Sequence, residues 1–346
     1  MRRIIKKFLI STALISVIGI SVLVVQLLRF QSAAVTLPDS EQIFVISPGS
    51  NIRTVAHQLS LKKIIDDPWL FILLARLKGV ETRVQAGEYR LLQEQSPSDL
   101  LDVFTKGQSI QYSLSVIEGW SFRQMLQELQ KNPAITSLLK EKSNAEIMAA
   151  IGFEGQHPEG LFFPDTYRFP RGTTDIQFLK RAYRLMQSQL QREWDNRAPD
   201  LPLSSSYEAL ILASIIEKET GVAYERPLIA GVFIQRLRKG MRLQTDPTII
   251  YGLGESFDGK IRSRDLKKNT PYNTYLHKGL TPTPIALPGL GAIRAALNPA
   301  ISEALYFVAK GDGTHQFSKT LEEHNKAVVK YQLKGRKNRR KISSES

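Results

Sequence analysis

The chain has 346 residues, of which 42% are hydrophobic and 23% are charged. This composition is typical of a folded protein with one large or two moderate domains. It contains no cysteine, which excludes disulfides and cysteine-ligated metal sites. The formal net charge of +14 predicts attraction to a polyanion: nucleic acid, anionic lipid or an acidic cell-wall polymer.

An apolar segment near the N-terminus predicts a membrane anchor. Residues 8–28 contain no charged side chain, and about 20 helical residues at ~1.5 Å each cross a hydrocarbon core. Only Arg29 follows closely, whereas four basic residues precede the segment: Arg2, Arg3, Lys6 and Lys7. The positive-inside rule then makes residues 1–7 a basic cytoplasmic tail. We therefore expect a single-pass inner-membrane protein whose remaining chain lies outside the cytoplasm.

The alternative interpretation of this segment is a cleaved signal peptide. Ser32-Ala33-Ala34 loosely resembles a cleavage site of small residues. Signal peptides, however, have apolar cores of only roughly 7 to 15 residues, which favours the uncleaved anchor. A location outside the cytoplasm also disfavours nucleic acid as the partner, and no nucleic-acid-binding motif accompanies the charge.

After a small, polar linker (29–41), residues 42–115 predict a small α/β module. Ser50 is a plausible cap for its first helix, in which apolar residues recur at helical spacing from Ile52 to Leu59. The predicted elements are a strand at 42–46, a helix around 52–59, a helix at 68–77, a returning strand at 87–91 and a helix at 100–104. This order resembles the LysM-like module of wall-binding proteins; the alternative is a plain structural spacer.

Helical patterns dominate residues 116–333, so the predicted fold class is α+β with a mainly helical second domain. The predicted helices are 121–130, 144–151, 174–194, 206–220, 292–297 and 321–333. Residues 242–291 are rich in Pro, Gly, Thr, Asn and Tyr, and long irregular segments in a compact domain usually carry function. The chain ends in a basic tail (334–346).

Helix 206–220 carries two glutamates at its end. Ser205 and Glu208 form a capping box, Gly221 stops the helix, and the body between them is almost entirely apolar, which predicts burial. At ~100° per residue Glu217 and Glu219 diverge, so they do not form a paired site. Burial raises a carboxyl pKa, and a protonated acid is what cleavage of a glycosidic bond requires. The alternative is that both glutamates form ion pairs with Lys218, Arg226 or another cation.

The absence of an obvious second carboxylate does not exclude sugar cleavage. Most glycosidases use two carboxylates, one as acid and one as base or nucleophile. In a lytic transglycosylase the C6 hydroxyl of N-acetylmuramic acid is the nucleophile. One glutamate can then protonate the leaving oxygen and deprotonate that hydroxyl.

Four motifs, in this order and spacing, resemble the endolytic murein transglycosylase (YceG-like) family: Glu159–Tyr167, Ala213–Thr220, Arg242–Thr248 and Thr270–Tyr275. The resemblance extends from the anchor to Tyr306–Ala309 and His315–Phe317. It implies that Glu217 is the catalytic acid and base and that Glu219 supports it. It also implies cleavage of the MurNAc–GlcNAc β-1,4 bond in nascent strands, leaving 1,6-anhydroMurNAc ends, and termination of strand growth beside the peptidoglycan synthases.

The same motifs supply candidate substrate-binding residues. Amide, hydroxyl, carboxylate and aromatic groups suit sugar hydroxyls and acetamides, and the candidates are Gln244, Thr245, Asp246, Tyr272, Asn273, Tyr275, Glu219 and Tyr167. Asp246-Pro247, Thr270-Pro271 and Asn273 could instead build turns. Phe162 and Phe163 are predicted core residues.

Thr281 and Leu287 depart from the family pattern, in which proline and asparagine are usual at these places. The five histidines show no HExxH pair, so we expect no metal and no cofactor. The expected partners are glycan strands, peptidoglycan synthases and the membrane. The alternative function is a non-catalytic peptidoglycan-binding scaffold, which would need no catalytic glutamate.

Overall fold

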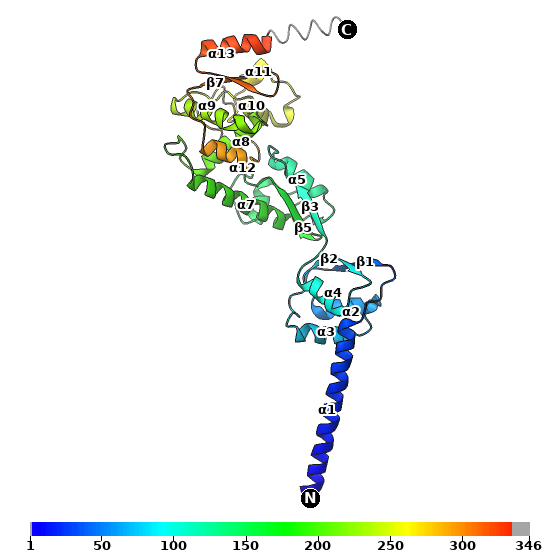
Figure 1. Ribbon diagram of the computed structural model, residues 1–346. Helices are drawn as coiled ribbons and strands as arrows, with labels where there is room; N and C mark the ends of the chain where they lie inside the picture. Colours follow the sequence, from blue (N-terminus) through cyan, green and yellow to red (C-terminus); the bar gives the residue numbers. More distant parts are fainter. Residues whose placement is uncertain (1, 334–346) are drawn as a thin grey trace. The chain divides into compact units, whose positions relative to one another are not determined.

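A computed structural model describes residues 2–333 and has a mixed α+β fold (Figure 1). The described chain divides into two compact units. The first contains the residues up to 113 together with 134–136 and 168–173, and the second contains the others. The predicted basic tail, 334–346, lies outside the described residues.

The first unit begins with α1, Arg2–Ser32. Its segment Leu9–Ser32 is long and apolar enough to cross a membrane. The prediction of one N-terminal apolar helix is confirmed, and the helix is a few residues longer at each end than the predicted 8–28.

The first unit is built around an antiparallel pair of strands. The strands are β1, Glu41–Ile46, and β2, Gly87–Leu92. Helices α2 (Ile52–Leu61) and α3 (Pro68–Leu77) lie between them in the chain, and α4 (Pro97–Thr105) follows. All five predicted elements are therefore confirmed. The likeness of this unit to a LysM module stays a prediction.

An aromatic cluster lies in the core of the first unit. The ring of Phe104 stacks on Phe44 at 5.7 Å between centroids and meets Tyr89 edge-on at 4.9 Å. The predicted cap of α2 was wrong by one residue. Asn51, not Ser50, caps the helix, because its Oδ1 accepts a hydrogen bond from the Thr54 amide at 3.0 Å.

Helices dominate the second unit, and α8 (Ser206–Glu219) has the longest unbroken run of buried residues among the helices described. Every residue from Ala209 to Ile216 is buried, and α8 packs against α7, α9, α10 and α12. The helices described in this unit are α5 (Phe122–Lys131), α6 (Asn144–Ala150), α7 (Asp175–Asp195), α9 (Arg226–Arg238), α10 (Asp246–Leu253), α11 (Ser263–Leu266), α12 (Leu290–Leu297) and α13 (Leu321–Val328). The predicted buried helix therefore forms the centre of this unit.

Two predictions near α8 need correction. The capping box is half formed: Ser205 Oγ accepts from the Glu208 amide at 3.3 Å, but the Glu208 carboxylate binds the Ser204 amide at 2.6 Å. The segment 242–291 is not irregular throughout, since it contains α10 and α11. Helix α10 begins at Asp246-Pro247, where a proline in the first turn loses no helical hydrogen bond.

Short strand pairs complete the fold. In the second unit β7 (Tyr306–Ala309) and β8 (His315–Ser318) form an antiparallel pair just before α13. In the other small sheets β3 (Gln111–Ser115) pairs with β5 (Thr166–Pro170), and β4 (Ile135–Thr136) pairs with β6 (Thr173–Thr174). The pair β7–β8 matters most for function, because it forms one wall of the cavity described below.

Candidate active site

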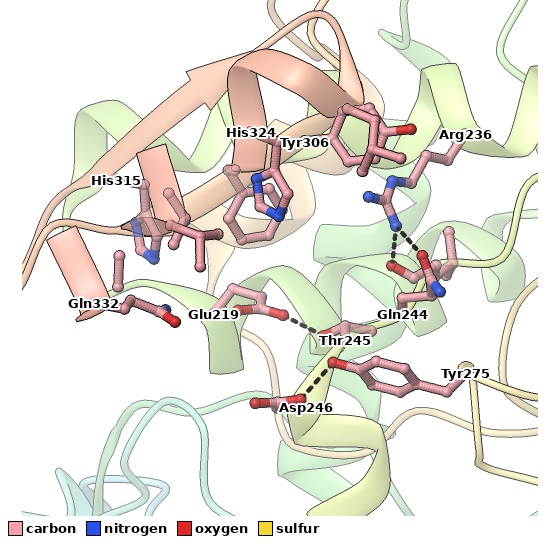
Figure 2. Close-up of a pocket in the computed structure, with 16 residues that line it drawn as sticks. Glu219, Arg236, Gln244, Thr245, Asp246, Tyr275, Tyr306, His315, His324 and Gln332 are labelled. Carbon is pink, nitrogen blue, oxygen red and sulfur yellow. Dashed lines mark hydrogen bonds between the residues drawn. The ribbon is translucent and has the colours of Figure 1, made fainter. Parts of the chain in front are cut away.

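A cavity of about 470 Å³ lies beside the C-terminal end of α8 (Figure 2). Glu219 enters it from α8, and Gln244, Thr245 and Asp246 enter it from the start of α10. Figure 2 shows His315, His324 and Tyr306 on the opposite side, contributed by β8, α13 and β7. The mixture of carboxyl, amide, hydroxyl and aromatic groups is suited to a polar ligand with flat apolar faces.

Glu219 is the carboxyl group of this cavity that holds a proton most readily. Burial raises its pKa to about 7, and the nearby Asp246 raises it as well, whereas the Thr245 hydroxyl and His315 act in the opposite direction. The Thr245 hydroxyl donates a hydrogen bond to Glu219 Oε1. A carboxyl group with this pKa is largely protonated below neutral pH and can donate its proton to a ligand.

Asp246 and Tyr275 form a second polar pair in the wall. The Tyr275 hydroxyl donates to Asp246 Oδ1 at 2.6 Å, and Asp246 is the first residue of α10, where a negative charge is favoured. Gln244 has a left-handed backbone with φ of 51°, which is unusual for a residue other than glycine. The backbone N–H of Gln244 donates a hydrogen bond to the Thr274 carbonyl at 3.1 Å. Strained backbone of this kind clusters at functional sites.

A buried histidine–glutamate pair also reaches the cavity. His315 Nδ1 lies 2.7 Å from Glu225 Oε2, and the His315 amide donates to Glu225 Oε1 at 2.8 Å. Glu225 is almost completely buried. The Glu225 carboxylate at Nδ1 fixes the orientation of the His315 ring, and His315 lines the cavity. The sequence did not predict this pair, because its partners are 90 residues apart.

Glu217 lies in a different environment. Its Oε1 forms an ion pair with Arg226 Nη2 at 3.1 Å, and its Oε2 accepts from the Gly289 amide at 2.9 Å. The Glu217 side chain is 5% exposed and does not line the cavity. Burial raises the pKa of Glu217, while Gly289 and Arg226 oppose that rise and a neighbouring Glu118 adds to it. The predicted divergence of Glu217 and Glu219 is thus confirmed by their separate partners.

Three other predicted site residues lie outside the cavity lining. The Tyr272 hydroxyl bonds to Thr283 Oγ1 at 2.9 Å. Asn273 is buried and its Nδ2 donates to two backbone carbonyls, at 3.0 and 2.8 Å, which is the role of a turn residue. The Tyr167 hydroxyl donates to the Phe163 carbonyl at 2.5 Å within the core. Their visible contacts are structural.

The two departures from the family pattern occupy buried positions. Thr281 donates its hydroxyl to the Thr283 carbonyl at 2.8 Å, so it stabilises a turn. Leu287 is fully buried and its amide donates to the Trp120 carbonyl at 2.7 Å. Leu287 therefore packs in the interior and does not line the cavity.

The motif 159–167 contains a buried carboxyl group that the sequence did not single out. Glu159 accepts hydrogen bonds from the Phe122 amide at 2.9 Å and the Tyr251 hydroxyl at 3.2 Å. Burial raises its pKa to about 7. Phe162 and Phe163 are buried, which confirms their predicted place in the core. Among residues 2–333 no group of three or more His, Asp or Glu side chains is arranged to hold a metal ion.

Fold and site together define an α+β protein with an N-terminal apolar helix, a central buried helix and a protonatable glutamate at the edge of a polar cavity. Residues 44–330 match the YceG-like family. The chain belongs to this family.

Three similar proteins show how much of the chain the likeness covers. The chain is 33% identical over 303 residues to an endolytic murein transglycosylase of Bacillus subtilis, a match covering 83% of each chain. It is 28% identical over 323 residues to one of Streptococcus pneumoniae, where the match covers 83% of this chain and 57% of that longer one. A crystal structure of a YceG-like protein from Listeria monocytogenes is 30% identical, with a TM-score of 0.52, covering 83% of this chain and 98% of that one.

Proposed function

We propose that this protein is an endolytic murein transglycosylase. The observation that carries the proposal is a glutamate with a pKa near 7 facing a polar, aromatic cavity. The relatives that share most of the chain bear this name. The bond cleaved would be the MurNAc–GlcNAc β-1,4 linkage, and the products would carry 1,6-anhydroMurNAc ends.

The reaction needs one proton donor that later accepts a proton. The carboxylic acid gives its proton to the glycosidic oxygen as the bond to C1 breaks. The C6 hydroxyl of N-acetylmuramic acid then bonds to C1, and its proton returns to the carboxylate. No water is consumed, and the glutamate ends protonated as it began. A pKa near 7 suits both halves of this exchange at neutral pH.

The lining of the cavity favours Glu219 for this role, whereas the family resemblance implies Glu217. Glu219 faces the cavity, and the hydrogen bond it accepts there comes from an uncharged hydroxyl, so its proton is available to a ligand. Glu217 is held by Arg226 and Gly289 and does not line the cavity. We assign proton transfer to Glu219 and the positioning of the α9 and α12 ends to Glu217.

The other predicted residues and segments take supporting roles in this proposal. Gln244, Thr245, Asp246 and Tyr275 line the cavity and would bind sugar hydroxyl and acetamide groups. Tyr272, Asn273 and Tyr167 would maintain the shape of the site. Helix α1 would anchor the protein in the inner membrane with its N-terminus in the cytoplasm, and the LysM-like module would contact glycan. Cleavage beside the peptidoglycan synthases would terminate strand elongation.

The test is digestion of purified peptidoglycan by the detergent-solubilised full chain, with the products identified by mass spectrometry. Glu219→Gln is expected to lower the rate by roughly 10²- to 10⁴-fold, the usual contribution of a general acid. Glu217→Gln is the matched control two residues away and is expected to retain cleavage. Both variants should give unfolding transitions, which shows that they are folded.

Each other outcome has a clear meaning. Loss of cleavage in Glu217→Gln with activity retained in Glu219→Gln would restore the assignment implied by the resemblance. Reducing ends in place of anhydro ends would indicate a hydrolase. Binding of peptidoglycan without cleavage by the unmodified protein would establish the scaffold function.

A further inference from the structure

Helix α3 carries apolar residues on two faces. One face, with Leu70, Phe71, Leu74 and Ala75, is buried in the core of the first unit. On the other side Trp69 is 55% exposed and Leu77 is 66% exposed, and Leu73 between them is partly exposed. Residues four apart lie one above the next on a helix. Trp69, Leu73 and Leu77 therefore form an outward apolar stripe along α3.

The stripe lies on the helix that α1 packs against. Helix α1 contacts both α3 and α4, and its residues Leu27 and Phe30 pack against the core of the first unit. In Figure 1, α3 lies on the side of this unit from which α1 leaves, and β1 and β2 lie on the opposite side. A bilayer crossed by α1 would thus approach the unit from the side of α3.

The length of α1 sharpens this placement. The apolar segment starts at Leu9, and Leu27 is the first residue of α1 that packs against the core of the unit. Residues 9–26 give about 27 Å of helix. A hydrocarbon core is about 30 Å thick. The hydrocarbon therefore ends close to the level where α1 meets the module, and an apolar surface is favoured there.

We propose that the stripe formed by Trp69, Leu73 and Leu77 lies in the headgroup–acyl boundary of the membrane that α1 crosses. Tryptophan is enriched at this depth, because its ring is apolar while its N–H can bond to water or headgroups. The first unit is then held against the bilayer at two points, α1 and α3. The proposal rests on α1 being the membrane anchor and not on the enzymatic activity.

Because the chain contains no cysteine, a single introduced cysteine can be labelled selectively. Leu77→Cys, in the full chain reconstituted in phospholipid nanodiscs, receives a nitroxide label whose collisions with oxygen and with a water-soluble nickel chelate are measured. Ile43→Cys, on β1, is the matched control, because Ile43 is 55% exposed in the same unit. Both positions are already exposed, so neither change disturbs the core.

The expected result is a label at Leu77 that favours oxygen over the nickel chelate, whereas the label at Ile43 favours the chelate. Preference for the chelate at both positions, in protein that co-purifies with the nanodiscs, would overturn the proposal while leaving the anchor in place. Protein that fails to join the nanodiscs would remove the anchor and the proposal together. A Leu77 label shielded from both reagents would overturn the proposal too, because protein, not lipid, would then cover the stripe. None of these results depends on cleavage of peptidoglycan.

Discussion

The last turn of α8 carries the same residue type, glutamate, on two sides whose surroundings differ. Glu217 and Glu219 are separated by one residue, and both have a pKa raised by burial. On the Glu217 side an arginine and a backbone amide satisfy the carboxylate. On the Glu219 side the Thr245 hydroxyl donates a hydrogen bond to the carboxyl group, and both residues line the cavity. The two carboxyl groups therefore differ in their hydrogen-bond and ion-pair partners, not in residue type.

The packing around Arg226 shows how tightly the Glu217 side is closed. A Cβ atom added at Gly291 would lie 2.6 Å from Arg226 Nη1, so a side chain at the start of α12 would have to displace the guanidinium. The same guanidinium also lies 3.5 Å from Glu118 Oε2.

The largest expected effect comes from breaking the Glu217 side. Arg226→Met leaves Glu217 buried without its cation, and removing one partner of a buried ion pair costs about 3 to 5 kcal/mol. We expect that loss in the free energy of unfolding of the solubilised full chain at pH 8. The double variant Arg226→Met, Glu217→Gln should recover most of it, because no uncompensated charge remains. A double variant as unstable as the single one would show that Arg226 acts through Glu118 or through packing.

A smaller effect of opposite sign is expected on the Glu219 side. The folded pKa of about 7 lies above the ordinary value of 4.5, so the folded state binds the extra proton. The stabilisation that the protonated Glu219 contributes is fully present below pH 4.5 and is lost as the pH rises to about 7. Since each pKa unit is worth about 1.4 kcal/mol, the loss is at most roughly 3 kcal/mol. Glu219→Gln should therefore be more stable than the parent at pH 8.

The measurement is chemical unfolding of both proteins at pH 4.5 and pH 8. At pH 4.5 the difference between them should fall below about 1 kcal/mol, because half of the unfolded glutamate is then protonated as well. A gain in stability that is equal at both pH values would contradict a raised pKa. Stability gained by removing a group is the mark of one retained for function.

Much of α8 could be predicted from the sequence, since its signals are local. A serine cap, an unbroken apolar run and ~100° of rotation per residue indicate a buried helix whose two glutamates diverge. Helix α9 was missed because its buried residues, from Ile229 to Arg236, surround the helix and leave no apolar face to recognise.

The open side of α8 could not be predicted, because it depends on long-range contacts. Glu217 is closed off by Gly289, which lies 72 residues away in the chain, and His315 reaches Glu225 across 90 residues. Family resemblance located both glutamates but not the cavity. Only the packing of α10, β7 and β8 shows that Glu219 faces it.

The smallest expected effect tests the hydrogen bond that tunes Glu219. If Glu219 donates the proton, kcat/KM falls as the pH rises through about 7. The Thr245 hydroxyl stabilises the charged carboxylate, so Thr245→Val should raise the pKa of Glu219 and move this decline to higher pH. A hydrogen bond to a charged group is worth about 1.5 kcal/mol or more, which corresponds to a displacement of about one pH unit.

The matched control is Thr248→Val, a buried threonine of α10 whose hydroxyl bonds to the Thr245 carbonyl and to Thr274, not to Glu219. It should lower stability but leave the midpoint of the pH profile unchanged. A midpoint that stays in place in Thr245→Val but moves in Glu217→Gln would assign the titrating group to the other side of α8. If the midpoint of the pH profile moves only in Thr245→Val, the titrating group is the carboxyl of Glu219, which faces the cavity.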